Sequence, residues 1–268
     1  MISLESLRID AAEISDKISV FIRDQVQDAG LKGAVLSVSG GIDSAVALSM
    51  SVGALGPERV RAVTMPERDI TPESDITDVM RLADMLDVTC DTVEITGVMR
   101  VMREVLPLYD ASDLISSGNL KPRVRMTIAY HYANVLKSMV IGSSNRTEWL
   151  TGYFTKYGDG GVDIMPLVDL YKNQIRQLAV HLGIPDRIIR KKPSAGLWPG
   201  QTDEGELGIS YDDLDLILFY RDRGLSEKET ADELDIDQQL VHRVFQRVKA
   251  NEHKRCLPTI LRLRNHSS

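Results

Sequence analysis

The stretch Ala34-Val-Leu-Ser-Val-Ser-Gly-Gly-Ile-Asp-Ser44 decides the fold of this chain. It opens with a short apolar run typical of a buried β-strand, and the small residues from Ser44 to Val52 that follow indicate a helix. Between the two elements, Gly40 and Gly41 lie in a turn of serine and glycine. A strand that passes through a glycine turn directly into a helix is the first half of a β-α-β unit.

The same alternation continues along the chain. Further strands are predicted over residues 60–65, 89–95 and 139–142, and further helices over residues 73–86, 98–106 and 123–136. Ahead of the first strand, apolar residues from Leu4 to Val26 recur at three- and four-residue steps and predict one amphipathic helix that ends at Gly30. Strands that alternate with helices predict an α/β fold, namely a doubly wound, mostly parallel sheet with helices on both faces.

The second half of the chain is predicted to be mainly helical. A helix is expected over residues 170–182, and helices from Tyr211 to about Asn251 are interrupted at Gly224 and near residues 235–237. Between them, residues 193–208 contain Pro, Gly and Trp without a clear period, which is typical of a mobile loop or a lid. No linker rich in turn residues divides the chain, so we expect residues 1–268 to form a single domain.

Charge and apolar patterning exclude several classes of function. The formal net charge of −7 argues against broad contact with a phosphate backbone, so no nucleic-acid partner is expected. Residues 35–56 are apolar enough to suggest a membrane span, but they contain Asp43, Gly40-Gly41 and five serines, which are costly in lipid. No membrane partner is therefore expected.

The cysteines and the N-terminus indicate a compartment. Cys90 and Cys256 lie in no metal-binding or redox spacing, and we expect both to be buried small hydrophobic residues. Charged residues interrupt the N-terminus early, so no secretory signal is predicted. A reducing cytoplasm is the expected location.

The turn after the first strand has the chemistry of an anion site. A loop between the carboxyl end of a strand and the amino end of a helix presents backbone N–H groups and the positive end of the helix dipole. Ser39 and Ser44 add hydroxyl donors, and the Asp43 carboxylate would repel a phosphate unless a cation such as Mg²⁺ lay between them. The alternative is a plain turn in which Asp43 or Ser44 caps the helix.

Two motifs carry a resemblance to known families. Ser39-Gly-Gly-Ile-Asp-Ser44 resembles the pyrophosphate-binding loop of the N-type ATP pyrophosphatases, which have an adenine nucleotide alpha hydrolase-like fold. The run from Gly142 to Leu167, with Phe-Thr-Lys156-Tyr-Gly-Asp159-Gly at its centre, closely resembles the NAD synthetase family. The resemblance extends from about Ser3 to Pro258, and it divides the chain into an ATP-pyrophosphatase core at about 30–185, the lid at about 193–208 and C-terminal helices at 210–258.

The resemblance implies a ligase that forms a carbon–nitrogen bond. Its substrates would be ATP, deamido-NAD and ammonia, and its products NAD, AMP and pyrophosphate, formed through an adenylated carboxylate. Members of the family that use glutamine carry an added amidase domain, for which 268 residues leave no room, so ammonia is the expected direct donor, either from solution or from a separate amidase subunit. The resemblance also implies a homodimer.

The resemblance assigns roles to individual residues. Asp43, Glu148 and Lys172 would be catalytic, with Asp43 and Glu148 holding Mg²⁺ and Lys172 contacting a phosphate of ATP. The expected ATP-binding residues are Ser37, Val38, Ser39, Gly40, Gly41, Ile42, Asp43, Ser44, Ser143, Lys172 and Ser194. The expected deamido-NAD-binding residues are Arg123, Lys156, Asp163, His253 and Lys254.

Some positions near these motifs stay open. Arg123 and Arg125 cannot share one helix face, so we expect Arg123 to face the substrate and Arg125 to form a structural ion pair. Asp159 is equally compatible with a turn residue and a substrate contact. Asn145 and Gly196 depart from the familiar bacterial pattern, which has histidine and an acidic residue there.

Two other functions are compatible with parts of the sequence. Residues 225–248 resemble a helix-turn-helix, but residues 222–249 contain seven acidic residues against five basic ones, which disfavours DNA binding. Another ATP pyrophosphatase, such as a GMP synthetase subunit or a tRNA-modifying ligase, is the second alternative, and the absence of a basic extension disfavours tRNA.

Overall fold

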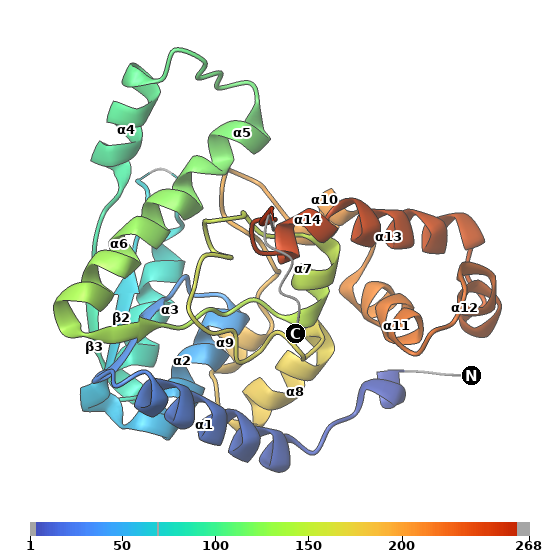
Figure 1. Ribbon diagram of the computed structural model, residues 1–268, viewed down its shortest axis with the longest axis horizontal. Helices are drawn as coiled ribbons and strands as arrows, with labels where there is room; N and C mark the ends of the chain where they lie inside the picture. Colours follow the sequence, from blue (N-terminus) through green and yellow to red (C-terminus); the bar gives the residue numbers. More distant parts are fainter. Residues whose placement is uncertain (1–3, 69, 262–268) are drawn as a thin grey trace.

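A four-stranded parallel sheet organises the first half of the chain (Figure 1). The computed structural model describes residues 4–68 and 70–261. The strands are β1 (Gly33–Ser37), β2 (Val60–Thr64), β3 (Thr89–Thr92) and β4 (Ser138–Val140), in the order β3-β2-β1-β4. Ala34 is in register with Val60 on one side and with Met139 on the other. The prediction of an α/β fold with a parallel sheet is confirmed.

Alternating side chains along a strand pack into two separate cores, one on each face of the sheet. In β1, Ala34 and Leu36 belong to the core under one face of the sheet, whereas Val35 belongs to the core under the other face. Helices α1 (Ala11–Asp28), α2 (Ile42–Leu55), α3 (Glu73–Met85) and α8 (Lys172–His181) contribute to the first core. Helices α4 (Thr96–Val105) and α6 (Leu120–Leu136) contribute to the second. Strands β1, β2 and β4 are therefore mostly buried between helices, as a doubly wound sheet requires, whereas the edge strand β3 is partly exposed.

The C-terminal helices have a core of their own. Helices α11 (Tyr211–Asp222), α12 (Glu227–Leu234) and α13 (Gln238–Ala250) pack around Leu214, Leu218, Val241 and Val248. Short helices complete the chain: α5 (Leu114–Gly118), α7 (Arg146–Thr151), α9 (Asp186–Ile189), α10 (Asp203–Leu207) and α14 (Glu252–Arg255), with 3-10 turns η1 (Leu4–Leu7) and η2 (Pro57–Arg59). The expected helical C-terminal portion is thus present. No helix within residues 4–68 and 70–261 is long and apolar enough to cross a membrane.

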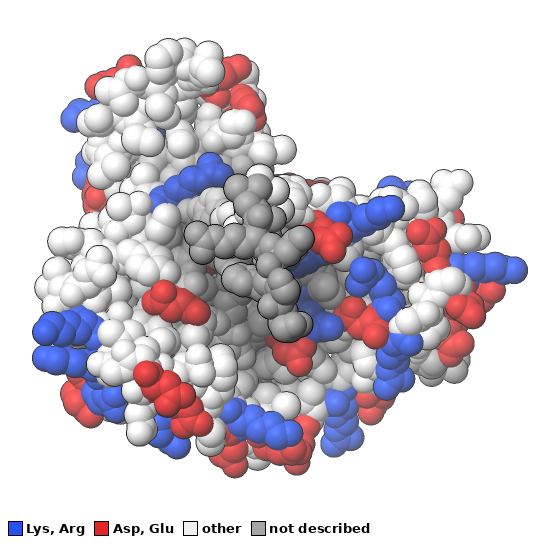
Figure 2. All heavy atoms as spheres, in the orientation of Figure 1, with Lys and Arg blue, Asp and Glu red and all other residues white. Residues whose placement is uncertain are grey.

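The region that resembles a helix-turn-helix packs its apolar side into this C-terminal core. Val241, Val244 and Val248 of α13 are buried there against α11 and α12. On the face shown in Figure 2, basic and acidic side chains are interspersed over these helices. This face does not present the continuous basic stripe that DNA binding requires.

The prediction of one N-terminal helix was wrong. Leu4–Leu7 form the separate turn η1, and α1 begins at Ala11 because the Asp10 side chain accepts hydrogen bonds from the N–H groups of Ala12 and Glu13. The break has a packing reason, since Leu7 is fully buried in the C-terminal core while Ile22 of α1 is buried under the sheet. Three- and four-residue periodicity alone does not reveal that two parts of a stripe serve different cores.

The segment predicted as an irregular loop contains the short helix α10. Thr202 caps it by accepting a hydrogen bond from the N–H group of Gly205. Before this helix, the carbonyl of Leu197 accepts a hydrogen bond of 2.5 Å from Lys121 Nζ of α6. The helix is too short to produce a periodic apolar pattern, which explains why the sequence did not indicate it.

The two cysteines differ in environment, and the expectation that both are buried was wrong for Cys256. Cys90 is half-buried against the first core, and burial is the main cause that raises the pKa of its thiol to about 11. Cys256 is exposed just after α14.

We predict that a thiol reagent at pH 8 modifies Cys256 of the native protein and leaves Cys90 unmodified, because the thiolate is the reactive species. Peptide mass spectrometry after brief labelling measures this difference. In Cys256→Ser, labelling should appear only after denaturation; fast labelling of Cys90 in the native variant would contradict the prediction.

Candidate active site

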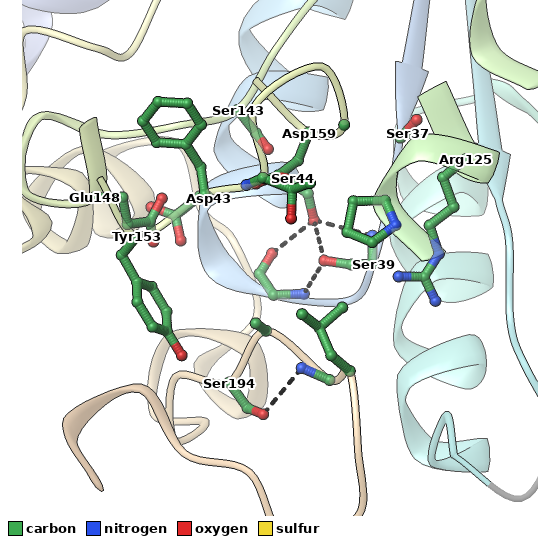
Figure 3. A pocket seen from close by; sticks show the side chains of 18 of the residues that line it. Ser37, Ser39, Asp43, Ser44, Arg125, Ser143, Glu148, Tyr153, Asp159 and Ser194 are labelled. Atoms are coloured by element: carbon green, nitrogen blue, oxygen red, sulfur yellow. Dashed lines mark hydrogen bonds between the residues drawn. The ribbon is translucent and has the colours of Figure 1, made fainter. Parts of the chain in front are cut away.

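A cavity of about 640 Å³ opens at the carboxyl ends of the strands. Its wall includes residues at the ends of β1, β2 and β4, the loop of residues 153–162, and residues 191–201 ahead of α10. The close view in Figure 3 shows Ser39, Asp43, Ser143, Glu148 and Ser194 around it. In open α/β sheets this edge is where ligands bind, because loops from several strands converge there.

The turn between β1 and α2 is held by its serines. Ser44 Oγ donates to the carbonyl of Gly41 at 2.9 Å and accepts from the N–H group of Ser39 at 3.2 Å (Figure 3). Gly40 has a φ of +78°, and a Cβ atom there would lie 2.8 Å from the carbonyl oxygen of Asp75, so only glycine fits. Gly41 is the N-cap of α2 and no side chain caps this helix. The alternative in which Asp43 or Ser44 serves as the cap is therefore wrong.

A buried lysine joins two carboxylates at the floor of the cavity. Lys172 Nζ lies 2.5 Å from Asp43 Oδ2 and 3.3 Å from Glu148 Oε1, and the lysine side chain is 3% exposed. Burial lowers the pKa of Lys172, but the charges of Asp43 and Glu148 outweigh it and raise that pKa overall. Burial, together with the charge of Asp43, raises the pKa of Glu148. The lysine is thus a fixed, buried positive charge in the cavity wall.

Three helix starts bring these groups together. Asp43 lies in the first turn of α2, Glu148 in the first turn of α7, and Lys172 is the first residue of α8. A cation at the amino end of a helix is unfavourable on its own, because it faces the positive end of the dipole. The two carboxylates supply the compensating negative charge at Lys172.

Asn145, whose consequence the sequence left open, contacts both carboxylates. It is fully buried; its Nδ2 donates to Asp43 Oδ1 at 2.8 Å, and its Oδ1 accepts from the N–H group of Glu148 at 3.0 Å. The side chain therefore holds both carboxylates. Asn145 and Glu148 form a capping box, and the spacing Asn-x-x-Glu could have indicated it.

Asp203 and Tyr211 lie on the other side of the lysine, and sequence reasoning missed both. Asp203 Oδ2 accepts a hydrogen bond of 3.0 Å from the Tyr211 hydroxyl, and Lys172 Nζ lies 5.0 Å from the centre of the Tyr211 ring. Both side chains are buried. Asp203 comes from α10, whose presence the sequence did not indicate, so no spacing in the sequence relates it to Lys172.

Almost all of the expected ATP-binding residues line the cavity. Ser37, Val38, Ser39, Gly41, Ile42, Asp43, Ser44, Ser143, Lys172 and Ser194 form part of its wall. Gly40 lies behind it, where its carbonyl accepts a hydrogen bond from Lys191 Nζ at 3.2 Å. Ser194 Oγ donates to the carbonyl of Gln201 at 2.8 Å and so shapes the loop of residues 191–201. Contact of these residues with ATP stays a prediction.

The expected deamido-NAD-binding residues form a cluster beside the cavity. Lys254 lines the cavity and donates to the carbonyls of Gly152 and Phe154. Lys156 Nζ donates to the carbonyl of His253 at 2.5 Å, and the guanidinium of Arg123 lies 3.4 Å from the carbonyl of Lys156. These basic residues, which come from three separate segments, therefore lie side by side.

Asp163 and the two arginines of α6 differ in their surroundings. Asp163 accepts from the Tyr130 hydroxyl at 2.9 Å and from the N–H group of Val140 at 2.8 Å, which ties its segment to β4.

Arg125 lines the cavity and donates to the carbonyl of Met65 at 3.1 Å, so the expectation that it forms a structural ion pair was wrong. Arg123 is exposed outside the cavity wall, and its contact with substrate stays a prediction.

Asp159 combines the two interpretations that the sequence left open. Its Oδ1 accepts from the N–H group of Thr155 at 2.8 Å, which closes the turn, and the residue also lines the cavity (Figure 3). Loss of hydration raises the pKa of the Asp159 carboxyl, although the hydrogen bond from Thr155 lowers it. Phe154 is buried and stacked on Trp149, and it lines the cavity as well.

This fold and site define a nucleotide-binding α/β protein with a phosphate-binding loop after its first strand. The NAD synthase family matches residues 14–258, and the NH(3)-dependent NAD(+) synthetase of Methanosarcina acetivorans is 44% identical over 252 residues, which are 94% of this chain and 98% of the relative. The chain belongs to the NAD synthase family. This membership favours the main interpretation over a GMP synthetase subunit or a tRNA-modifying ligase.

Two solved structures have the same fold over nearly the whole chain. The NMN synthetase of Francisella tularensis superposes with a TM-score of 0.84 at 34% identity and covers 95% of this chain and 99% of its own. The NH3-dependent NAD synthetase of Campylobacter jejuni superposes with a TM-score of 0.81 at 29% identity and covers 95% of this chain and 100% of its own. The prediction of the family is therefore confirmed.

The substitution Lys172→Met tests the buried charge cluster. It keeps an apolar chain of similar length but leaves Asp43 and Glu148 without their cation, so the free energy of unfolding should fall by about 3–5 kcal/mol at pH 8.5. Because the pKa of Glu148 is raised in the folded state, lowering the pH protonates this carboxyl in the folded protein before the unfolded one. The loss should therefore be smaller at pH 6 than at pH 8.5.

Urea unfolding at the two pH values, in buffer without divalent metal, measures this loss. Lys191→Met is the matched control, since Lys191 pairs with Asp75 outside the cluster and is more exposed than Lys172. The free energy of unfolding should fall less for Lys191→Met than for Lys172→Met. An equal loss at pH 6 and pH 8.5 for Lys172→Met would contradict the assignment of Glu148 as the group that titrates.

Proposed function

We propose that this chain is an ATP-dependent ligase that converts deamido-NAD and ammonia into NAD, with release of AMP and pyrophosphate. The observation that carries the proposal is the Lys172 ammonium, held by Asp43 and Glu148 beside the serine–glycine turn after β1. A nicotinate carboxylate has no useful leaving group. ATP supplies one, and a site that neutralises departing phosphate charge is what such chemistry needs.

The proposed reaction has two steps. First, a carboxylate oxygen of deamido-NAD attacks the α-phosphorus of ATP; the bond from this phosphorus to the oxygen that bridges to the β-phosphate breaks, and pyrophosphate leaves. Then ammonia attacks the carbonyl carbon of the acyl-adenylate, AMP leaves with the bonding electron pair, and the nitrogen loses a proton to give the amide. Ser39, Ser44 and the amino end of α2 would hold the phosphates, and Lys172 would stabilise the charge that develops as pyrophosphate departs.

The residues present fit a magnesium ion. Asp43 and Glu148 already share one cation, Lys172, and their oxygens are the hard ligands that Mg²⁺ takes together with water and substrate phosphates. These two carboxylates would hold it, and Asn145, which donates to Asp43, would orient one of them. When bound, Mg²⁺ supplies charge neutralisation on the phosphates of ATP.

The dinucleotide would extend from the cavity over the cluster of Arg123, Lys156, His253 and Lys254. Asp163, which accepts a hydrogen bond from the N–H group of Val140, is the fifth residue proposed to contact it. We propose that the chain works as one unit, with an ATP-pyrophosphatase core at about 30–185, a lid at about 193–208 and C-terminal helices at 210–258.

The cytoplasm is the proposed location, which the free cysteines Cys90 and Cys256 support, since free thiols persist in a reducing compartment.

Incubation of the purified chain with ATP, Mg²⁺, deamido-NAD and ammonium tests the proposal. Chromatography should detect NAD, AMP and pyrophosphate in equal amounts, and glutamine in place of ammonium should give no NAD. Nicotinate mononucleotide is included as a competing substrate, because the Francisella tularensis structure of the same fold is an NMN synthetase. Formation of ADP, or of AMP without any amidated product, would defeat the proposed activity.

We propose that the chain forms a homodimer through the lobe of α4 and α5. Val98, Val101 and Val105 are exposed along α4, and Leu114 and Ile115 are exposed on α5. On the face shown in Figure 2 the middle of this lobe is white, with charged side chains at its edges. Val98, Val101 and Val105 are three and four residues apart and therefore lie on one face of α4, and an exposed apolar face is typical of an interface.

Sedimentation velocity should give a dimer for the wild-type chain and a monomer for Val101→Glu, because a charge buried in an interface is costly. Val180→Glu, at an exposed valine on α8, is the matched control and should stay dimeric. A wild-type monomer at assay concentrations would exclude the interface.

A further inference from the structure

A fully buried carboxylate lies next to the site without lining the cavity. Asp215, in the first half of α11, is 0% exposed. Its Oδ1 accepts a hydrogen bond of 2.5 Å from Thr147 Oγ1 of α7. Its Oδ2 accepts from the backbone N–H group of Asn173 at 2.7 Å and from Asn173 Nδ2 at 2.9 Å, both on α8. One side chain therefore joins three helices.

The partners of Asp215 are the sequence neighbours of the charge cluster. Thr147 immediately precedes Glu148, and Asn173 immediately follows Lys172. Thr147 Oγ1 also accepts the backbone N–H group of Lys172 at 3.1 Å. The hydrogen bonds of Asp215 thus fix the first turns of α7 and α8 at the residues beside Glu148 and Lys172.

The buried position of Asp215 costs hydration of its carboxylate but gives that carboxylate three hydrogen bonds. A buried carboxylate loses hydration, and burial raises the pKa of Asp215 to about 6. The three hydrogen bonds and the amino end of α8, which favours a negative charge, offset this cost. An apolar side chain would fill the volume without the desolvation cost, but it would make none of these directional bonds.

We propose that Asp215 is a positioning residue that holds Lys172 and Glu148 in their catalytic geometry. This inference rests on the proposed ligase function. Lys172 Nζ lies 2.5 Å from Asp43 and 3.3 Å from Glu148, and a relative shift of α7 and α8 changes both distances. Neither Asp215 nor its partner Thr147 lines the cavity, and Thr147 in turn accepts the backbone N–H group of Lys172, which does. We therefore expect Asp215 to affect the chemistry through the positions of α7 and α8.

The substitutions Asp215→Leu and Asp215→Asn test the inference, with Leu218→Ala as the control. Leu218 is fully buried on the same helix, and its truncation weakens packing of the C-terminal core without touching α7 or α8 hydrogen bonds. All variants are assayed at a temperature where urea and thermal unfolding find them folded. We expect kcat of Asp215→Leu to fall about 100-fold, since a displacement of about 1 Å has that effect.

Three further readouts separate positioning from stability. The KM for ATP should change by less than about threefold, because the phosphate loop is unaltered. Asp215→Asn should recover part of kcat, because its amide oxygen still accepts the N–H group of Asn173. Leu218→Ala should keep kcat within about twofold of the wild type. The inference fails, and the role is merely structural, if Asp215→Leu has the same kcat as Leu218→Ala. If Asp215→Leu does not fold, the same comparison is made with Asp215→Asn.

A measurement without turnover keeps the two proposals apart. Lysine acylation by an activated ester, followed by mass spectrometry, should leave Lys172 unmodified in the wild type and in Leu218→Ala, because the amine is buried and protonated. In Asp215→Leu and Asp215→Asn we expect modification of Lys172 to rise about tenfold or more as its ion pairs loosen. A wild type that makes no NAD overturns the proposed function; equal protection of Lys172 in all variants overturns the positioning role.

Discussion

A buried ammonium group shared by two carboxylates is the interaction on which the site depends. Lys172, Asp43 and Glu148 are far apart in the sequence, and each lies in the first turn of a different helix. Removing Lys172 leaves two neighbouring carboxylates without their cation, which is strongly unfavourable in a partly buried place. The packing of α2, α7 and α8 must therefore satisfy the charge balance of the site as well as the volume of the core.

The sheet provides the frame for this arrangement. Alternating side chains of β1 enter two cores, so the strand is fixed from both faces and its carboxyl end delivers the serine–glycine turn to a defined place. The C-terminal core around α11, α12 and α13 is joined to α7 and α8 by two carboxylates of α11. Asp215 accepts hydrogen bonds from Thr147 and Asn173, and Asp222 accepts from Arg146 of α7 and from Tyr171, the N-cap of α8. The cavity wall thus includes Val38 and Ile42 of the first core and Val63 and Met65 of the second.

A layer of buried polar groups connects the cluster to the rest of the protein. Asn145 bonds to Asp43 and Glu148, Tyr211 bonds to Asp203 beside Lys172, and Thr147 bonds to both Asp215 and the backbone of Lys172. In a region of low dielectric such bonds are strong when complete and costly when one partner is missing. This layer explains how a helix that does not line the cavity can control the geometry of the charges in it.

The sequence by itself determined the sheet, the phosphate loop and the family, because apolar period and glycine requirements are local and the Phe-Thr-Lys156-Tyr-Gly-Asp159-Gly run is specific. It also named the three members of the charge cluster, through the resemblance. The tertiary structure alone decided which side chains meet: Asn145 reaches Asp43 across 102 residues, Asp203 arrives on a helix without a periodic signal, and Arg125 rather than Arg123 lines the cavity. Such contacts depend on how separate elements pack, and no local pattern records the distance between residues that only folding brings together.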